Sequence, residues 1–314
     1  MKLFIYKILI FCSISLIALA VTNYIADKGL RKSNYWMYED WNEIYNTNIE
    51  ANTVIIGSSR SWRHLSPEIL DSITGLKSYN LGLDGSDLDM QIVKYKVYSN
   101  IHPKPKIIIQ MLDINTLWTS GQLPYPNQFI PYFNDSVLYS GIMRYNYFSK
   151  IQVKLPLLTK YFGSGNIVMY GFKEFAGISK IPKSKMNGYC GNNKSWDNSF
   201  DIFKKNNSKG YIVGIDTIAL NKFDKFLRAQ QNENIKVVLL FSPEYIECQH
   251  IEENRKAVID TFFYFAHKYN IPFINYSDSS LSYQKKYFYN SQHLNKKGAE
   301  LFSKSVAKTI TTFL

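Results

Sequence analysis

The chain has 314 residues, of which 46% are hydrophobic, 16% aromatic and 20% charged. This length suits one large α/β domain or two small ones, and the composition excludes a globally disordered chain. The 37 basic residues outnumber the 25 acidic residues, for a net charge of +12, but they form no basic block, so we expect no nucleic-acid partner. The three cysteines exclude a disulfide-rich scaffold, and we expect no metal and no cofactor.

The first 25 residues form a candidate membrane segment. An apolar run without charge extends from Ile8 until Asp27, close to the ~20 residues that a helix needs to cross a bilayer. The alternative is a cleaved signal peptide, because the Ala-Leu-Ala triplet at 18–20 resembles a cleavage site. Two lysines near the start favour a cytoplasmic N-terminus. We therefore expect the rest of the chain on the periplasmic side of the inner membrane, anchored by this helix or secreted after cleavage.

Short apolar runs and helical segments alternate in the rest of the chain. Residues 26–50 are polar with scattered aromatic residues, and we interpret them as a juxtamembrane linker or helix. From 51 to 314, continuous apolar runs are typical of strands buried on both faces of a parallel sheet. This pattern predicts a three-layer, doubly wound, flavodoxin-like α/β domain with a mostly parallel sheet. The expected strands are 53–56, 78–81, 106–111, 235–241 and 271–274, and the clearest expected helices lie around 88–95, 258–265 and 299–313.

One interval, about 116–214, interrupts this alternation. It is rich in Tyr, Phe, Pro, Gly and Asn and has few periodic segments. A structureless loop of this length is uncommon in a compact domain. We expect an insertion with partial structure of its own, such as a lid or a substrate-facing subdomain. Its aromatic side chains could stack on sugar rings, although such residues are more often part of a core.

Four polar stretches follow the first three strands or precede the last helix, where an open α/β sheet gathers its ligands. Ser59, in the Gly-Ser-Ser turn after the first strand, is a candidate nucleophile or a helix cap. After the second strand, Gly85 would let a backbone N–H approach a substrate oxygen. Asn115, after the third strand, can donate to an oxyanion. Gly85 and Asn115 could also be ordinary loop residues. His293, before the last helix, is a candidate general base or a surface histidine.

In this order, the four stretches resemble the SGNH (GDSL-like) hydrolase family over roughly residues 52 to 313, with the insertion excluded. Gly57-Ser58-Ser59 resembles the Gly-Asp-Ser block of that family, and Asn290-x-x-His293 resembles its Asp-x-x-His block. The sequences Gly-Ser-Ser-Arg, Asn-Leu-Gly and Phe-Tyr-x-x-x-His-Leu-Asn are similar to exported bacterial members that act in the acylation of cell-surface glycans.

The resemblance implies an esterase or O-acyltransferase with an acyl-Ser59 intermediate. His293 would be the base, and Ser59, Gly85 and Asn115 would supply the oxyanion hole. The substrate would be an acylated glycan or another ester, such as an acetylated extracytoplasmic glycan. One alternative is a catalytically inactive glycan-binding or assembly protein that partners a membrane acyltransferase, and another is a lipase-like esterase acting on the membrane.

Two blocks depart from the family pattern. The third is reduced to Asp113-Ile114-Asn115-Thr116, where the family has Gly-x-Asn-Asp, and the fourth lacks its acid. Asn290 stands where the family has an acid, so it can orient His293 but cannot stabilise an imidazolium by charge. A Ser–His dyad, or a different acid such as Asp278, is therefore left open. His64 is expected either to line the pocket or to pack on the surface, and a disulfide between cysteines 190 and 248 is also left open.

Overall fold

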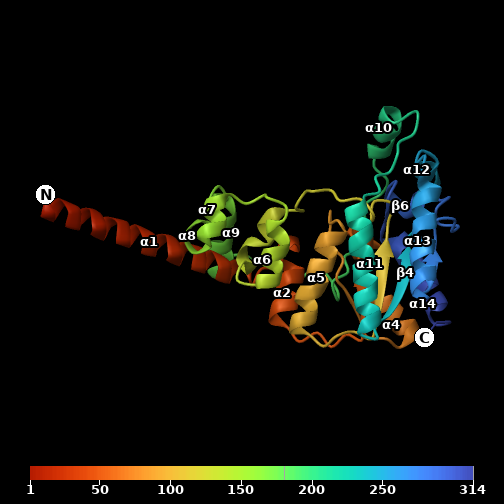
Figure 1. Cartoon of the computed structure of the whole chain (residues 1–314), viewed down its shortest axis with the longest axis horizontal. Helices are drawn as coiled ribbons and strands as arrows, with labels where there is room; N and C mark the ends of the chain where they lie inside the picture. Colours follow the sequence, from red (N-terminus) through yellow and green to blue (C-terminus); the bar gives the residue numbers. More distant parts are fainter. Residues whose placement is uncertain (180, 314) are drawn as a thin grey trace. The chain divides into compact units, whose positions relative to one another are not determined.

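The computed structural model describes residues 1–179 and 181–313 (Figure 1), and the chain divides into two compact units. Unit 1 combines Met1–Thr47 with Tyr125–Ser184, and unit 2 combines Asn48–Pro124 with Lys185–Leu314. The interval expected as one insertion, about 116–214, is therefore shared between the units. Its middle part belongs to unit 1 together with the N-terminal segment, and both its ends belong to unit 2.

A five-stranded sheet forms the centre of unit 2. The strand order is β2-β1-β3-β4-β5, and every neighbouring pair is parallel, which confirms the doubly wound arrangement predicted from the sequence. All residues of β1 and β3 are buried, as expected for strands that are covered on both faces. The strands are β1 (Thr53–Ile56), β2 (Ser78–Asn80), β3 (Ile107–Leu112), β4 (Lys236–Phe241) and β5 (Phe273–Asn275).

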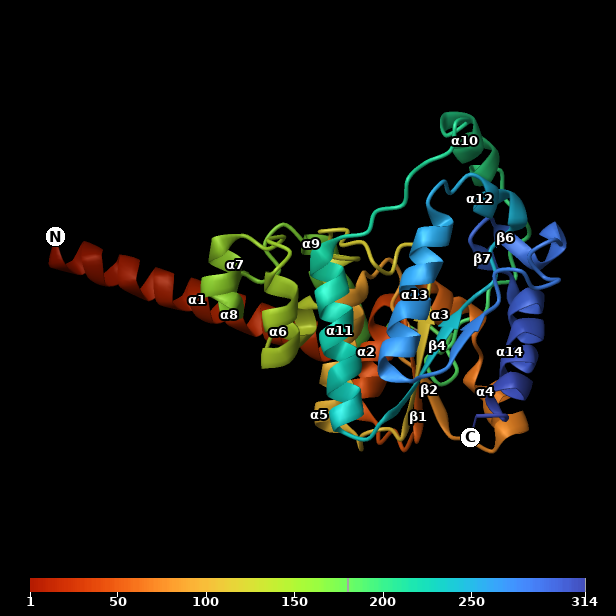
Figure 2. The same ribbon diagram turned by 45° about the vertical axis from the view of Figure 1, so that its right-hand side comes forward.

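Helices cover both faces of this sheet (Figure 2). α14 packs against α3 and α4 on one face, and α11 packs against α5 and α13 on the other. The apolar stripe predicted for the last helix is buried at Phe302, Val306 and Ile310, but Phe313 follows the helix and is exposed. The helices of unit 2 are α3 (Ser59–His64), α4 (Pro67–Thr74), α5 (Leu88–Ile101), α10 (Ser199–Asn206), α11 (Thr217–Asn232), α12 (Ile246–His250), α13 (Arg255–Tyr269), α14 (Lys296–Ile310) and the 3-10 turn η3 (Lys285–Tyr287).

A short antiparallel hairpin precedes α14. Its strands β6 (Phe288–Asn290) and β7 (His293–Leu294) place Asn290 opposite His293. The side chain of Asn295 then caps α14 by accepting the N–H of Gly298 at 3.0 Å. The hairpin is thus fixed directly ahead of a helix that packs on the sheet.

Unit 1 is helical and contains the apolar N-terminal helix α1 (Lys2–Leu30). α1 is long and apolar enough to cross a membrane, either as an anchor or as a signal sequence. Its C-terminal part packs closely on α9, because a Cβ atom on Gly29 would lie 1.8 Å from the carbonyl oxygen of Gly171. The other elements are α2 (Trp36–Asn46), η1 (Pro126–Gln128), η2 (Ile130–Tyr132), α6 (Ser136–Met143), α7 (Lys150–Lys154), α8 (Pro156–Thr159) and α9 (Gly165–Phe175).

Candidate active site

The hydroxyl of Ser59 meets the imidazole of His293 in unit 2. The distance between Ser59 Oγ and His293 Nε2 is 2.7 Å, although 234 positions separate the two residues in the sequence. Ser59 is the first residue of α3, directly after the turn that follows β1. This turn requires Gly57, because a Cβ atom there would lie 2.8 Å from the Cβ atoms of Met111 and Ser61. The tight packing of the turn therefore sets the direction of the Ser59 side chain.

Asn290 determines which nitrogen of His293 carries the proton. The Asn290 Oδ1 atom accepts the backbone N–H groups of Gln292 at 3.1 Å and His293 at 2.9 Å, so this side of the amide is the carbonyl oxygen. The same oxygen lies 3.0 Å from His293 Nδ1, which must therefore be the N–H donor. Nε2 is left as the acceptor of the Ser59 hydroxyl. An uncharged side chain thus holds the tautomer that a general base requires.

The imidazole of His293 is half-buried at the pocket wall and is neutral. Burial, together with the positive charges of Arg60 and Arg63, lowers the pKa of His293 to about 3, although Glu244 and Asp197 act in the opposite direction. The ring of Tyr289 stacks on the imidazole, with ring centroids 5.3 Å apart and planes inclined by 15°. His293 is therefore fixed in orientation and free of a proton on Nε2 at neutral pH.

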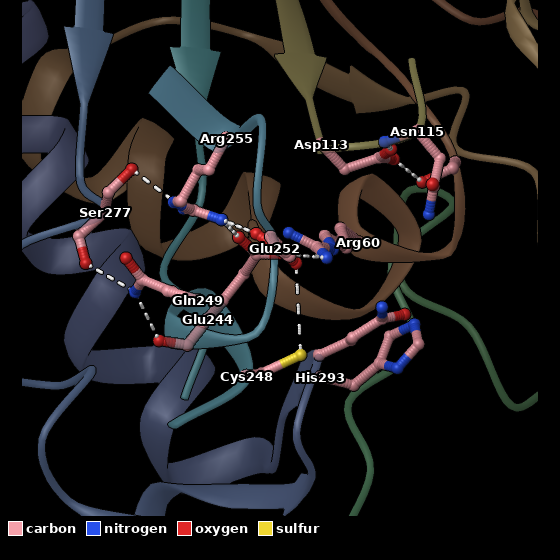
Figure 3. Close-up of polar contacts among 12 residues, drawn as sticks. Arg60, Asp113, Asn115, Glu244, Cys248, Gln249, Glu252, Arg255, Ser277 and His293 are labelled. Carbon is pink, nitrogen blue, oxygen red and sulfur yellow. Dashed lines mark hydrogen bonds and ion pairs between the residues drawn. The ribbon is translucent and has the colours of Figure 1, made fainter. Parts of the chain in front are cut away.

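A pocket of about 180 Å³ opens at these two side chains. Gly85 and Asn115, the predicted oxyanion donors, line the same pocket as Ser59 and His293. Gly85 has a φ of +68°, a conformation that favours glycine. In the view of Figure 3, Asn115 lies above Arg60 and the imidazole of His293 lies below it. The remaining lining residues are mostly polar: Ser58, Arg60, Ser86, Asp87, Gln91, Asp113, Thr116, Trp118, Ser120 and Gln292.

Asp113 connects the loops that carry Ser59 and Asn115. Its carboxylate accepts the hydroxyl of Ser58 at 2.5 Å and the backbone N–H of Asn115 at 2.9 Å. The Asp113 backbone N–H in turn donates to the hydroxyl of Thr116 at 2.8 Å. These bonds couple the turn after β1 to the turn after β3, so Asp113 positions the pocket wall.

Behind the pocket lies a buried cluster of charges (Figure 3). The guanidinium of Arg60, only 3% exposed, forms an ion pair with Glu244, which also pairs with Arg255 at 2.5 Å. Arg255 makes a further ion pair with Glu252. Burial alone would raise the pKa of Glu244, but Arg60 and Arg255 outweigh it and lower the pKa. Burial and the charge of Glu244 raise the pKa of Glu252 to about 7.

His64 neither lines the pocket nor packs on the surface, which are the two places expected from the sequence. It is fully buried, and its Nε2 accepts the backbone N–H of Leu294 at 3.0 Å. Burial and the neighbouring His293 lower the pKa of His64 well below its usual range. The neutral His64 ring therefore supports the strand that carries His293.

Other side chains left open by the sequence lie elsewhere. Asp278 is exposed and accepts a hydrogen bond from the hydroxyl of Tyr283, so it is not the partner of His293. Cys190 and Cys248, whose pairing the sequence left open, are not joined by a disulfide. Among residues 1–179 and 181–313, no group of three or more His, Cys, Asp and Glu side chains has the arrangement of a metal site.

The sequence pattern did not identify Glu244 or Arg255 as site residues, and Arg60 entered only as part of the Gly-Ser-Ser-Arg motif. Glu244 follows β4 by three residues, so the rule that sites gather at the carboxyl ends of strands could have identified it. The pairing of Arg60 with Glu244 joins positions 184 residues apart and has no local signal.

Comparisons with known proteins leave the family open. No protein-family model matches the chain, and no curated protein matches it. One similar solved structure comes from Bacteroides fragilis and is provisionally described as an acylhydrolase. It shares 10% sequence identity, covers 83% of this chain and 88% of its own, and has a TM-score of 0.37. A similarity this low assigns no activity.

Proposed function

We propose that this protein is a serine-dependent ester hydrolase or O-acyltransferase that works through an acyl-Ser59 intermediate. The observation that carries the proposal is the hydrogen bond between Ser59 and His293, in which Asn290 fixes the imidazole as an acceptor. A hydroxyl held by a correctly oriented base is the arrangement of an activated serine nucleophile. The resemblance of the four sequence blocks to the SGNH hydrolases supports the same chemistry.

In the first half of the reaction, His293 Nε2 takes the proton of Ser59 as the serine oxygen attacks the ester carbonyl. The carbonyl carbon becomes tetrahedral, and its oxygen becomes an oxyanion. When the ester C–O bond breaks, His293 returns the proton to the leaving alkoxide, and the acyl group stays on Ser59. A water molecule or a sugar hydroxyl, deprotonated by the same nitrogen, then attacks the acyl-enzyme and restores the free serine.

The oxyanion would be held by the N–H groups of Ser59 and Gly85 and by the amide of Asn115. All three residues line the pocket, and Gly85 has no side chain to cover its own backbone N–H. Preorganised donors of this kind stabilise the transition state because they need no reorientation as the charge develops.

The pocket favours a short acyl group. The pocket, of about 180 Å³, is lined by many hydroxyl, amide and carboxylate groups and by few apolar side chains. An acetyl ester of a glycan fits such a site better than a long acyl chain, which needs an apolar channel. With α1 as an anchor, the substrate would be an acetylated glycan on the periplasmic side of the inner membrane, and a membrane acyltransferase would be a partner.

A second candidate function is binding without turnover. Asn290 offers no negative charge to an imidazolium, and Arg60 and Arg63 oppose its formation. A protein with this weakness could hold an acetylated glycan for a membrane acyltransferase and leave Ser59 unacylated.

Hydrolysis of p-nitrophenyl esters separates the candidates. We expect the wild type to release p-nitrophenol from the acetate faster than from the octanoate, and Ser59→Ala to reduce release from the acetate by about 10⁴-fold. Ser72→Ala, which changes an exposed serine of α4, is the matched control and should behave as the wild type.

Equal rates for the wild type and Ser59→Ala would contradict the enzymatic proposal and leave the binding candidate. A preference for the octanoate would contradict the short acyl group and favour a lipase-like esterase. Adding a methyl glycoside to the acetate reaction distinguishes the two enzymatic outcomes, because a transferase forms the acetylated glycoside, which mass spectrometry detects.

A further inference from the structure

The apolar part of α1 ends where the helix enters the fold of unit 1. Asn23 is the first buried residue of the helix, and the residues before it are exposed or half-buried. In both views, the N-terminal part of α1 extends beyond the other helices of unit 1 (Figures 1 and 2). At 1.5 Å per residue, the stretch from residue 3 to 22 is about 30 Å long, which matches the hydrocarbon core of a bilayer. The boundary of the bilayer would therefore lie near Asn23.

The segment from Lys150 to Phe162, which contains α7 and α8, lies at this boundary. The side chain of Asn23 donates to the backbone carbonyl of Leu157 at 2.8 Å. One turn further along α1, Asp27 pairs with Lys160 and accepts the hydroxyl of Tyr161 at 2.6 Å. These polar contacts hold the segment against α1 at the depth at which its apolar part ends.

Four apolar side chains of this segment are left uncovered. Ile151 and Leu155 are each 52% exposed, Leu157 is 66% exposed and Phe162 is 76% exposed; these four residues are called the collar. The exposed Lys150 and Lys154 accompany them. Apolar side chains beside lysines are typical of segments that lie in the membrane interface.

The backbone under the collar is well fixed. The side chain of Thr159 donates to the carbonyl of Ile151 at 2.9 Å. The amide of Gln152 donates to the carbonyls of Lys160 at 3.2 Å and Phe162 at 3.3 Å. The apolar surface is therefore a built feature of a folded helical hairpin rather than a loose end.

We propose that the collar inserts into the outer interface of the bilayer that α1 crosses, with Lys150 and Lys154 against the phosphate headgroups. The proposal rests on α1 being retained as an anchor and is independent of the chemistry at Ser59. It gives unit 1 two attachments to the membrane, a spanning helix and an interfacial surface. Together they would hold unit 1 in one orientation on the bilayer, whereas a spanning helix alone would leave it free to tilt.

The test uses the full chain reconstituted into vesicles of phosphatidylcholine and phosphatidylglycerol. The three native cysteines are replaced by Ser or Ala, and single cysteines are introduced by Leu157→Cys and Phe162→Cys and labelled with the fluorophore NBD. Ile178→Cys is the matched control, because Ile178 is 71% exposed in the same unit but follows α9, which packs on the C-terminal end of α1. Leu16→Cys reports on the spanning helix itself.

We expect labels at 157 and 162 to show blue-shifted emission in vesicles and to be quenched by lipids that carry a nitroxide on the acyl chain. The label at 178 should remain water-like. Water-like emission at 157 and 162 with a buried label at 16 would overturn the collar while retaining the anchor. Water-like emission at all four positions would overturn the collar and the anchor together, without bearing on Ser59.

Discussion

Two groups of side chains lie beside Arg60, and different interactions hold them together. On the pocket side, Ser59, His293 and Asn290 form a chain of hydrogen bonds in which no group carries a charge at neutral pH. On the other side, Arg60, Glu244 and their neighbours form a chain of buried ions.

The uncharged chain of hydrogen bonds serves reactivity, and the chain of buried ions serves stability. The neutral chain ends at a hydroxyl that lines a pocket, so its members can exchange protons with a substrate. Each carboxylate of the ionic chain is paired with arginine, and removing one would leave a buried charge uncompensated. Changes on the pocket side should therefore alter the rate, and changes in the ionic cluster should alter the stability of the fold.

The largest expected effect is on the rate, through His293. His293→Ala should lower kcat/KM for p-nitrophenyl acetate by about 10⁴-fold, because the base is lost. The melting temperature should change little, since the imidazole makes few bonds besides those to Ser59 and Asn290. His64→Ala is the informative companion, because it removes the acceptor of the Leu294 N–H at 3.0 Å and should destabilise the fold by about 1–3 kcal/mol. A rate loss from His64→Ala as large as that from His293→Ala would contradict the distinction between His293 as the base and His64 as a support of the fold.

The next effect is on stability, through Glu244. Glu244→Gln should lower the free energy of unfolding by about 3–5 kcal/mol, because Arg60 and Arg255 lose their shared counter-charge. Chemical denaturation measures this change. A second substitution, Arg60→Met, should restore part of the lost stability, since it removes one of the uncompensated charges. An unchanged denaturation midpoint for Glu244→Gln would show that the ionic cluster does not stabilise the fold.

A smaller effect is expected at Asn290, where a charge can be added to the neutral side. In Asn290→Asp, the carboxylate can still accept from His293 Nδ1 and would also stabilise the imidazolium, so kcat/KM should rise by about 10-fold or more. Asn290→Ala removes the acceptor and should lower kcat/KM by about 10²-fold. A large loss in the Asp variant would mean that the Asn290 amide itself contacts the substrate.

The smallest effects concern pH. Because the pKa of His293 lies near 3 rather than 6.5, the base stays unprotonated, and kcat/KM should not fall between pH 7 and 5. For the same reason, the stability that His293 contributes is complete above pH 6.5 and is lost as the pH falls toward 3. A decline of kcat/KM with a midpoint near pH 6.5 would contradict the lowered pKa of His293.

Glu252 has the opposite effect on the pH dependence of stability. Its pKa in the folded protein is about 7, above its ordinary value of 4.5, so the stability it contributes is present below pH 4.5 and is lost as the pH rises through 7. Glu252→Gln should remove this loss, so that its melting temperature falls less than that of the wild type between pH 5 and 8. Thermal melts of both proteins across this range test the prediction.

The sequence was most informative where a feature is local. The apolar run at Thr53–Ile56 and the longer ones around β3 and β4 predicted buried parallel strands, since only such strands need side chains that are apolar on both faces. The rule for strand ends made Ser59 a candidate site residue, and the place of His293 ahead of the last helix made it a candidate base. Their mutual distance could not be predicted, because it depends on the packing of α14 and the β6–β7 hairpin.

The sequence could not predict contacts that depend on three-dimensional packing. The role of Asn290 depends on two backbone N–H groups that fix its carbonyl, and a residue pattern does not show the orientation of an amide. The pairing of α1 with α9 depends on Gly29 and Gly171 meeting at one point, so the sequence could not assign part of the interval 116–214 to the N-terminal unit.

The most direct test of the central claim is covalent labelling of Ser59. The full chain is treated with a fluorophosphonate, digested and mapped by mass spectrometry, with His293→Ala treated in parallel. We predict a stoichiometric phosphonyl adduct on the peptide that contains Ser59 in the wild type and strongly slowed labelling in His293→Ala. Absence of the adduct from Ser59 in the wild type, or equally fast labelling of both proteins, would contradict the activation of Ser59 by His293.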